Sequence, residues 1–101
     1  MDMAEHAHVI DVSRYYGAQG KRHELVTAMK QLAEKASASK GCFGAQVCES
    51  DHDHDALVAV SRWSSQADLD AFANSSDFVH DRERLTSLLG KPAQREHLRP
   101  V

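Results

Sequence analysis

Apolar and polar residues alternate along parts of the chain, which predicts β-strands. In residues 8–16 the alternation places two sets of side chains on opposite faces, Val9, Asp11, Ser13 and Tyr15 on one and Ile10, Val12, Arg14 and Tyr16 on the other. Residues 42–49 and 56–63 show the same two-residue period. Residues 94–101 predict a fourth strand, which is more polar than the others.

A longer period, of three to four residues, predicts helices between these strands. An apolar stripe runs through residues 21–39 and consists of Leu25, Met29, Leu32, Ala33 and Ala36. Ser65 is the expected cap of a second helix, which residues 74–77 (NSSD) should break in two because their side chains compete for backbone hydrogen bonds. Ser76 is the expected cap of the second piece, and residues 90–92 (GKP) end it.

The order strand, helix, strand, strand, helix, strand predicts an α+β, ferredoxin-like fold with an antiparallel sheet and both helices on one face. We expect a single domain over residues 1–101, of which residues 1–7 are flexible. The inner strands are apolar on both faces, since one strand carries Phe43, Ala45 and Val47 on one face and the next carries Val58 and Val60 opposite Leu57, Ala59 and Trp63. A sheet with one face in water would be polar on that face, so the uncovered face is predicted to pair with a second copy in a homodimer.

Charge and hydropathy narrow the range of partners. The formal net charge is -3, with acidic and basic residues mixed along the chain, and no basic stripe is present that would neutralise a phosphate backbone. Nucleic acid is therefore not an expected partner. The longest wholly apolar run, residues 56–60, is far short of the roughly 20 residues that cross a bilayer, and the first residues lack a signal peptide's pattern. We expect no membrane association and a cytoplasmic location.

The cysteines and histidines predict neither an internal disulfide nor a metal site. Cys42 and Cys48 are six residues apart on one predicted strand, which separates them by about 20 Å. His52 and His54 lie in a polar connection, residues 50–55 (SDHDHD), which we interpret as a solvated turn because a flexible loop offers a metal no fixed second shell. No metal ligand is assigned.

Three stretches of the chain carry a resemblance to a known family. They are residues 39–50 (SKGCFGAQVCES), residues 61–65 (SRWSS) and residues 66–85 (QADLDAFANSSDFVHDRERL). Together with the order of strands and helices, they resemble the antibiotic biosynthesis monooxygenase family, which also includes haem-degrading enzymes and small quinol monooxygenases. The resemblance extends from about residue 8 to residue 101. It implies a dimeric α/β barrel with a pocket in each subunit, between the sheet and the second helix.

The resemblance also implies a chemistry, because cofactor-free members of the family oxidise electron-rich aromatic substrates in a dry cavity. The expected function is a cofactor-independent monooxygenase of an aromatic or quinol-type metabolite. The catalytic residues implied are His80 and Trp63. The side chains expected to contact the substrate are Phe72, Tyr16, Arg62, Leu69 and Phe78.

Two alternatives remain open. Ala59 and Leu69 stand where cofactor-free aromatic oxygenases of the family have asparagine and tyrosine, which favours a non-catalytic, small-ligand-binding or stress-associated dimer. A haem-binding or haem-degrading protein is the other alternative, with His80 as the residue nearest the position of the family's haem-associated histidine.

Overall fold

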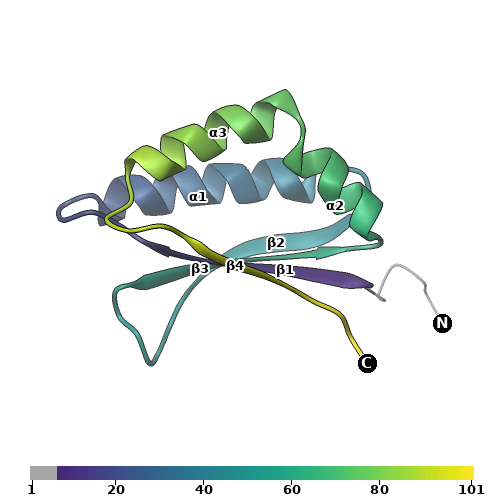
Figure 1. Ribbon diagram of the computed structural model, residues 1–101, viewed down its shortest axis with the longest axis horizontal. Helices are drawn as coiled ribbons and strands as arrows, with labels where there is room; N and C mark the ends of the chain where they lie inside the picture. Colours follow the sequence, from purple (N-terminus) through teal and green to yellow (C-terminus); the bar gives the residue numbers. More distant parts are fainter. Residues whose placement is uncertain (1–6) are drawn as a thin grey trace.

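A computed structural model describes residues 7–101, so the expected flexibility of the N-terminus concerns residues that lie largely outside the described part. Four strands and three helices follow one another along the chain (Figure 1): β1 Val9–Tyr16, α1 Arg22–Ser37, β2 Cys42–Glu49, β3 Ala56–Trp63, α2 Gln66–Ala73, α3 Ser76–Ser87 and β4 Gln94–Leu98. The strands form one antiparallel sheet in the order β2-β3-β1-β4. All three helices cover the same face of this sheet, and the predicted α+β, ferredoxin-like fold is confirmed.

The last strand is shorter than expected. It ends at Leu98, which pairs with Ile10, whereas the sequence predicts a strand to the end of the chain. Pro100 lacks a backbone N–H and restricts the residue before it, so the ladder of hydrogen bonds does not continue through this position. All five residues of β4 are exposed, and the strand forms one edge of the sheet.

Serine side chains determine where the second and third helices begin. Ser65 caps α2 and accepts a hydrogen bond from the backbone N–H of Asp68 at 3.1 Å. The expected break between the two helices is confirmed, but Ser75 rather than Ser76 caps α3. Ser75 has an extended backbone and accepts from the N–H of Phe78 at 3.2 Å, while the next residue is already helical.

The core between the helices and the sheet consists of two separate clusters. One joins α1 and α3 to β3, and its largest fully buried members are Leu25, Met29, Leu57 and Leu85. The other lies toward α2 and contains Val9, Ala36, Trp63 and Leu69. Trp63 is fully buried in this second cluster. The division matters for function because the cavity described below is bordered by both clusters.

A β-bulge changes the predicted faces of β2. The pairing with β3 shifts register between Cys42 and Gly44, so Cys42 lies opposite Trp63 and packs against the second core cluster. Phe43 is left 39% exposed, and the expectation that it shares a face with Ala45 is wrong. The extra residue of a bulge reverses the alternation on one side of it.

No helix covers the opposite face of the sheet (Figure 1). Cross-strand neighbours on this face include Val12 with Val60 and Arg14 with Val58. These side chains are half-buried in the single chain, and Cys48 pairs with Val58 on the same face. The face is therefore a mixed surface with an apolar centre, as the alternation predicts.

Candidate functional site

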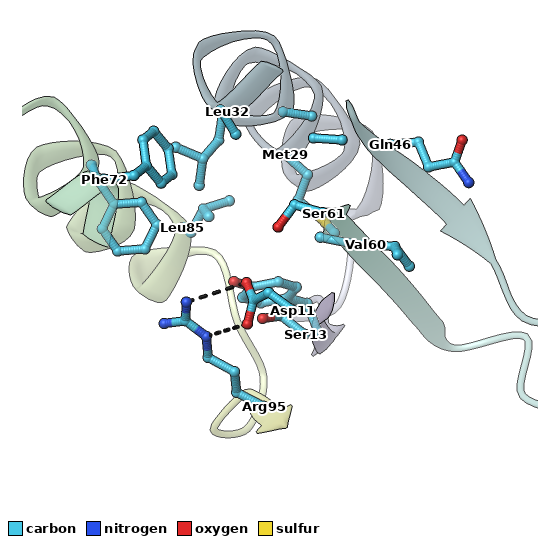
Figure 2. Close-up of a pocket in the computed structure, with 16 residues that line it drawn as sticks. Asp11, Ser13, Met29, Leu32, Gln46, Val60, Ser61, Phe72, Leu85 and Arg95 are labelled. Atoms are coloured by element: carbon cyan, nitrogen blue, oxygen red, sulfur yellow. Dashed lines mark hydrogen bonds and ion pairs between the residues drawn. The ribbon is translucent and has the colours of Figure 1, made fainter. Parts of the chain in front are cut away.

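A cavity of about 50 Å³ lies between the sheet and the helices. Its lining comes from all seven elements: Asp11, Ser13, Tyr15, Met29, Leu32, Ala33, Ala36, Ala45, Gln46, Ala59, Val60, Ser61, Phe72, Phe78, Leu85 and Arg95. In Figure 2, Gln46 and Val60 point away from the other labelled side chains, which converge on the space between α1, α3 and β1. The volume exceeds the roughly 10–15 Å³ that a single water molecule needs.

The helical side of the cavity is apolar. Phe72 of α2 and Phe78 of α3 are in edge-to-face contact, with ring centroids 5.1 Å apart. Leu85 and Met29 are almost fully buried on either side of the space, and Leu32 completes this wall (Figure 2). Such a surface excludes water and accommodates the faces of a ring.

The sheet side of the cavity is polar. Asp11 and Ser13 of β1 and Ser61 of β3 all point toward the helices, and Asp11 lies directly opposite Ser61 in the ladder. Ser13 is only 4% exposed and is the one buried polar residue in the described part of the chain. Polar side chains at core-facing positions of a strand are unusual unless they have partners or a function. All three groups have partners within the protein: Arg95 for Asp11, Trp63 for Ser61 and Tyr15 for Ser13.

Asp11 is held by residues of the neighbouring strand β4. The guanidinium of Arg95 donates from Nε to Oδ1 at 2.8 Å and from Nη2 to Oδ2 at 3.2 Å (Figure 2). His97, two residues further on the same side of β4, has Nε2 3.2 Å from Oδ1 of the same carboxylate. The bidentate contact with Arg95 fixes the plane of the Asp11 carboxylate and connects the outer strand β4 to β1.

Ser61 is oriented by Trp63. The indole Nε1–H donates to the hydroxyl of Ser61 at 2.8 Å, so this oxygen is an acceptor on one side while its own O–H remains able to donate toward the cavity. Trp63 also contacts Phe72, at 5.4 Å between ring centroids. Trp63 therefore contacts two lining residues, Ser61 and Phe72, without being part of the lining itself.

Tyr15 is the ionisable hydroxyl of the lining. Burial raises the pKa of Tyr15, and its interactions with Ser13 and with the Arg95 guanidinium oppose this rise. The charges of Asp11 and Arg82 also act on it, which places Tyr15 within reach of this group of charged side chains. A neutral tyrosine in this position is a hydrogen-bond donor for a negatively charged oxygen.

The structure brings together only some of the residues predicted from the sequence. Phe72 and Phe78 line the cavity, and Trp63 lies directly behind it. Leu69 is buried beside Trp63 in the second core cluster and is separate from the lining. His80 is exposed on α3 and is not among the lining residues.

The other two predicted contact residues lie away from the cavity. Arg62 is exposed on the uncovered face of the sheet, where it pairs with Ile10. Tyr16 lies at the end of β1, where its hydroxyl donates to Asp53 at 3.1 Å and Lys91 lies 3.9 Å from its ring centroid.

The polar wall was missed by sequence reasoning. Asp11, Ser13 and Tyr15 share one face of an alternating segment, but the pattern alone does not say that this face meets the helices. Arg95 and His97 are two residues apart on a polar strand and become part of the site only through the pairing of β4 with β1. The sequence did contain one indication that this face meets the helices. Val9 and Tyr15, both large and uncharged, lie on it with the polar Asp11 and Ser13 between them.

Other candidate sites are not supported by the geometry. Within residues 7–101 no group of three or more histidine, cysteine or acidic side chains is arranged to hold a metal ion. Nor does this part of the chain contain a helix long and apolar enough to cross a membrane. Cys42 and Cys48 are both free thiols.

Comparison with known proteins gives consistent results for family and fold. The family model described as antibiotic biosynthesis monooxygenase matches residues 9–84. No curated protein matches the chain significantly. Among solved structures, a Mycobacterium tuberculosis protein is 24% identical, with a TM-score of 0.84 and coverage of 92% of this chain and 94% of its own.

Two further solved structures have similar folds at lower identity. A conserved protein of Methanosarcina mazei is 20% identical, with a TM-score of 0.86 and 95% of both chains covered. A structure named as an antibiotic biosynthesis monooxygenase is 13% identical, with a TM-score of 0.81 and coverage of 92% of this chain and 98% of its own. At these identities the likeness shows a common fold.

Proposed function

This chain belongs to the antibiotic biosynthesis monooxygenase family, and from that membership we propose that it is a small, homodimeric, cytoplasmic monooxygenase of a phenolic or quinol-type metabolite that needs no resident cofactor. The observation that carries the proposal is the cavity, which combines an apolar helical wall containing Phe72 and Phe78 with a polar wall on the sheet. Oxidation of a phenol by dioxygen requires this combination. The ring must be held away from water, and its oxygen must be stabilised as it loses a proton.

The chemistry is balanced without an external reductant. A phenol that loses its O–H proton becomes electron-rich enough to give electrons to dioxygen. In the keto form of the phenol, one ring carbon carries two hydrogens. One atom of dioxygen replaces both of these hydrogens, which gives a quinone. The other oxygen atom leaves with the two hydrogens as water. All the electrons come from the substrate, so the protein has to bind, orient and stabilise.

In this proposal the residues of the polar wall divide those tasks. Asp11 is the only carboxylate of the lining and accepts the phenolic proton. The hydroxyls of Ser13, Tyr15 and Ser61 donate to the oxygen that becomes negative, and Trp63 orients one of them. His80 is exposed and outside the lining, so no proton transfer is assigned to it.

The homodimer is proposed from the uncovered sheet face. Its centre is formed by half-buried side chains such as Val12, Val58 and Val60, and no helix of the chain covers it. A second copy applied to this face would remove the apolar side chains from water. The two cavities lie on the other side of the sheets, so each subunit keeps its own site.

Oxygen uptake tests the proposed function. Purified protein in a buffer with a metal chelator, given a series of phenols and hydroquinones, should consume oxygen in proportion to protein, and one labelled oxygen atom from ¹⁸O₂ should appear in the product. Phe72→Ala, which opens the apolar wall, should lower the rate at least about tenfold. Phe43→Ala, a change of the same kind on the exposed bulge, should leave the rate unchanged.

A second function is favoured by one specific observation. Ala59 contributes only a methyl group to the cavity, and Leu69 is buried in the core, at the positions where the cofactor-free enzymes of the family have polar side chains. A cavity with fewer polar groups can bind an aromatic molecule without oxidising it. Saturable binding of a phenol with no oxygen uptake would support this small-ligand-binding or stress-associated dimer instead.

The haem alternative does not fit the residues present. A haem needs an iron ligand directed into a large cavity, whereas His80 is exposed on the outside of α3 and the cavity measures about 50 Å³. The other histidine near the site, His97, lies beside Asp11 and is not part of the lining. No step of the proposed chemistry involves haem.

A further inference from the structure

The cavity contains one cation, and it lies at the edge of the sheet. Arg95 is the only basic residue of the lining, and it comes from β4, the outermost strand next to β1. Its guanidinium lies between the carboxylate of Asp11 and the ring of Phe78, 5.9 Å from the ring centroid. Arg95 therefore adds a positive charge to the polar wall of the cavity (Figure 2).

A second guanidinium, on an exposed side chain outside the lining, lies near the same phenylalanine. Arg82 of α3 lies 5.8 Å from the centroid of the same Phe78 ring. Within residues 7–101 no carboxylate lies at salt-bridge distance from Arg82, whereas Arg95 is paired with Asp11. Both arginine charges act on the hydroxyl of Tyr15. Arg95, Asp11 and the Tyr15 hydroxyl thus share this end of the cavity, and the charge of Arg82 acts on it from outside the lining.

The balance of charge at this end is positive. The lining has one anion, Asp11, and one cation, Arg95, and the nearby charge of Arg82 adds to the positive side. The side chains of Arg95 and Asp11 are 35% and 13% exposed, so their pair is partly hydrated. The Asp11 contact uses the Nε and Nη2 groups of Arg95, and a guanidinium has five N–H donors, so others remain for a second acceptor. The Arg95 guanidinium is therefore accessible to an anion that competes with Asp11 for it.

We propose, on the basis of the function assigned above to this cavity, that its ligand is a single-ring aromatic acid. The ring contacts Phe72 and Phe78, and the acidic oxygen binds Arg95 with Tyr15 as an additional donor, while the charge of Arg82 strengthens the attraction from outside the lining. Asp11 then acts as a built-in competitor for Arg95. A cavity that holds benzene measures about 150 Å³, so at about 50 Å³ this space admits a ring only when lining side chains move, and one ring requires less movement than a fused polycyclic ligand.

The single tryptophan of the chain provides the readout. The Trp63 indole N–H donates to Ser61, which lines the cavity, so its single ¹H–¹⁵N resonance reports occupancy independently of any turnover. Benzoate is the probe, and benzyl alcohol is the neutral control of similar size. Titration of each into the full-length protein should give a saturable shift for benzoate at concentrations at least about tenfold lower than for benzyl alcohol.

Three substitutions test the roles of the charges. Arg95→Gln should weaken benzoate binding about tenfold and leave benzyl alcohol unaffected, because a charge-assisted contact is lost. Asp11→Asn should tighten benzoate binding by about two- to fivefold, because the competitor is removed. Arg99→Gln, the same change just beyond β4 and outside the lining, should alter neither.

The outcomes separate this proposal from the proposed function. Equal binding of benzoate and benzyl alcohol, no binding of either, or weaker benzoate binding in Asp11→Asn would overturn the assignment of an acidic ligand. Oxygen uptake from neutral phenols that is as fast as from the corresponding phenolic acids would overturn it too, while the monooxygenase assignment would stand. Selective benzoate binding together with no oxygen uptake from any phenolic acid would support the ligand class and refute the enzyme.

Discussion

Substitution of Gly41 tests how the turn before β2 is packed against α2. Gly41 has φ +81°, a left-handed conformation, and an added Cβ would overlap the carboxylate of Asp68 and lie 2.7 Å from that residue's own Cβ. The carboxylate is held there by Ser64, whose hydroxyl donates to it at 2.6 Å. We expect Gly41→Ala to force α2, the helix that carries Phe72, away from the turn.

The size of the effect follows from two contributions. An alanine at positive φ is destabilised by about 1 kcal/mol after allowing for the reduced freedom of the unfolded chain. Overpacking of the kind expected against Asp68 adds about 1–3 kcal/mol. Gly20 is a matched control, because it has φ +78° and nothing within 4 Å of an added Cβ, so Gly20→Ala should show only the first contribution.

Urea unfolding measures the free energy of unfolding of both variants. The protein concentration must be the same in all experiments, because association of subunits affects the measured stability. The free energy of unfolding should fall by about 2–4 kcal/mol for Gly41→Ala and by about 1 kcal/mol for Gly20→Ala. Asp68→Ala should recover part of the difference in the double variant. Equal destabilisation by the two glycine substitutions would refute the contact between Gly41 and Asp68.

Three further predictions concern the core, the uncovered face and the cavity. Leu85→Ala should lower the free energy of unfolding by about 2–5 kcal/mol in urea, whereas Leu98→Ala, at an exposed position, should lower it by less than about 1 kcal/mol. Val60→Glu should convert the proposed dimer to monomer in sedimentation velocity, and an unchanged dimer would rule out this face as the interface. Burial raises the pKa of Tyr15 above its ordinary value of 10.0, so as the pH rises the unfolded state loses this proton before the folded state does. The free energy of unfolding should therefore fall as the pH rises above about 10. The fall should be less steep in Tyr15→Phe, which has no such proton.

The sequence predicts the elements of the fold well because their signals are local. The stripe of α1 and the serine before α2 depend on neighbours within a few residues, and both agree with the structure. The cap of α3 is displaced by one residue, since Ser75 and Ser76 are adjacent and only their backbone conformations distinguish them. The position of Phe43 is mispredicted because a bulge inserts one residue into an otherwise regular alternation.

The candidate site is predicted less well because it depends on pairing over long distances in sequence. Asp11 and Arg95 are 84 residues apart, and their contact follows from the register of β4 against β1. Alternation divides β1 into two faces without indicating which of them the helices cover. Of the predicted site residues, Phe72 and Phe78 lie in the lining, because both belong to the apolar stripes of their helices, and their contact with a substrate stays a prediction.

The contribution of every strand and helix to one small cavity has a consequence for how such a protein diversifies. No single segment can be exchanged to transfer the binding properties to another scaffold, since each supplies only a small part of the wall. Conversely, a substitution in any of the seven elements can reshape the space directly. The lining residues all lie in strands and helices, so selectivity can be altered gradually from any layer of the molecule without changing a connecting loop.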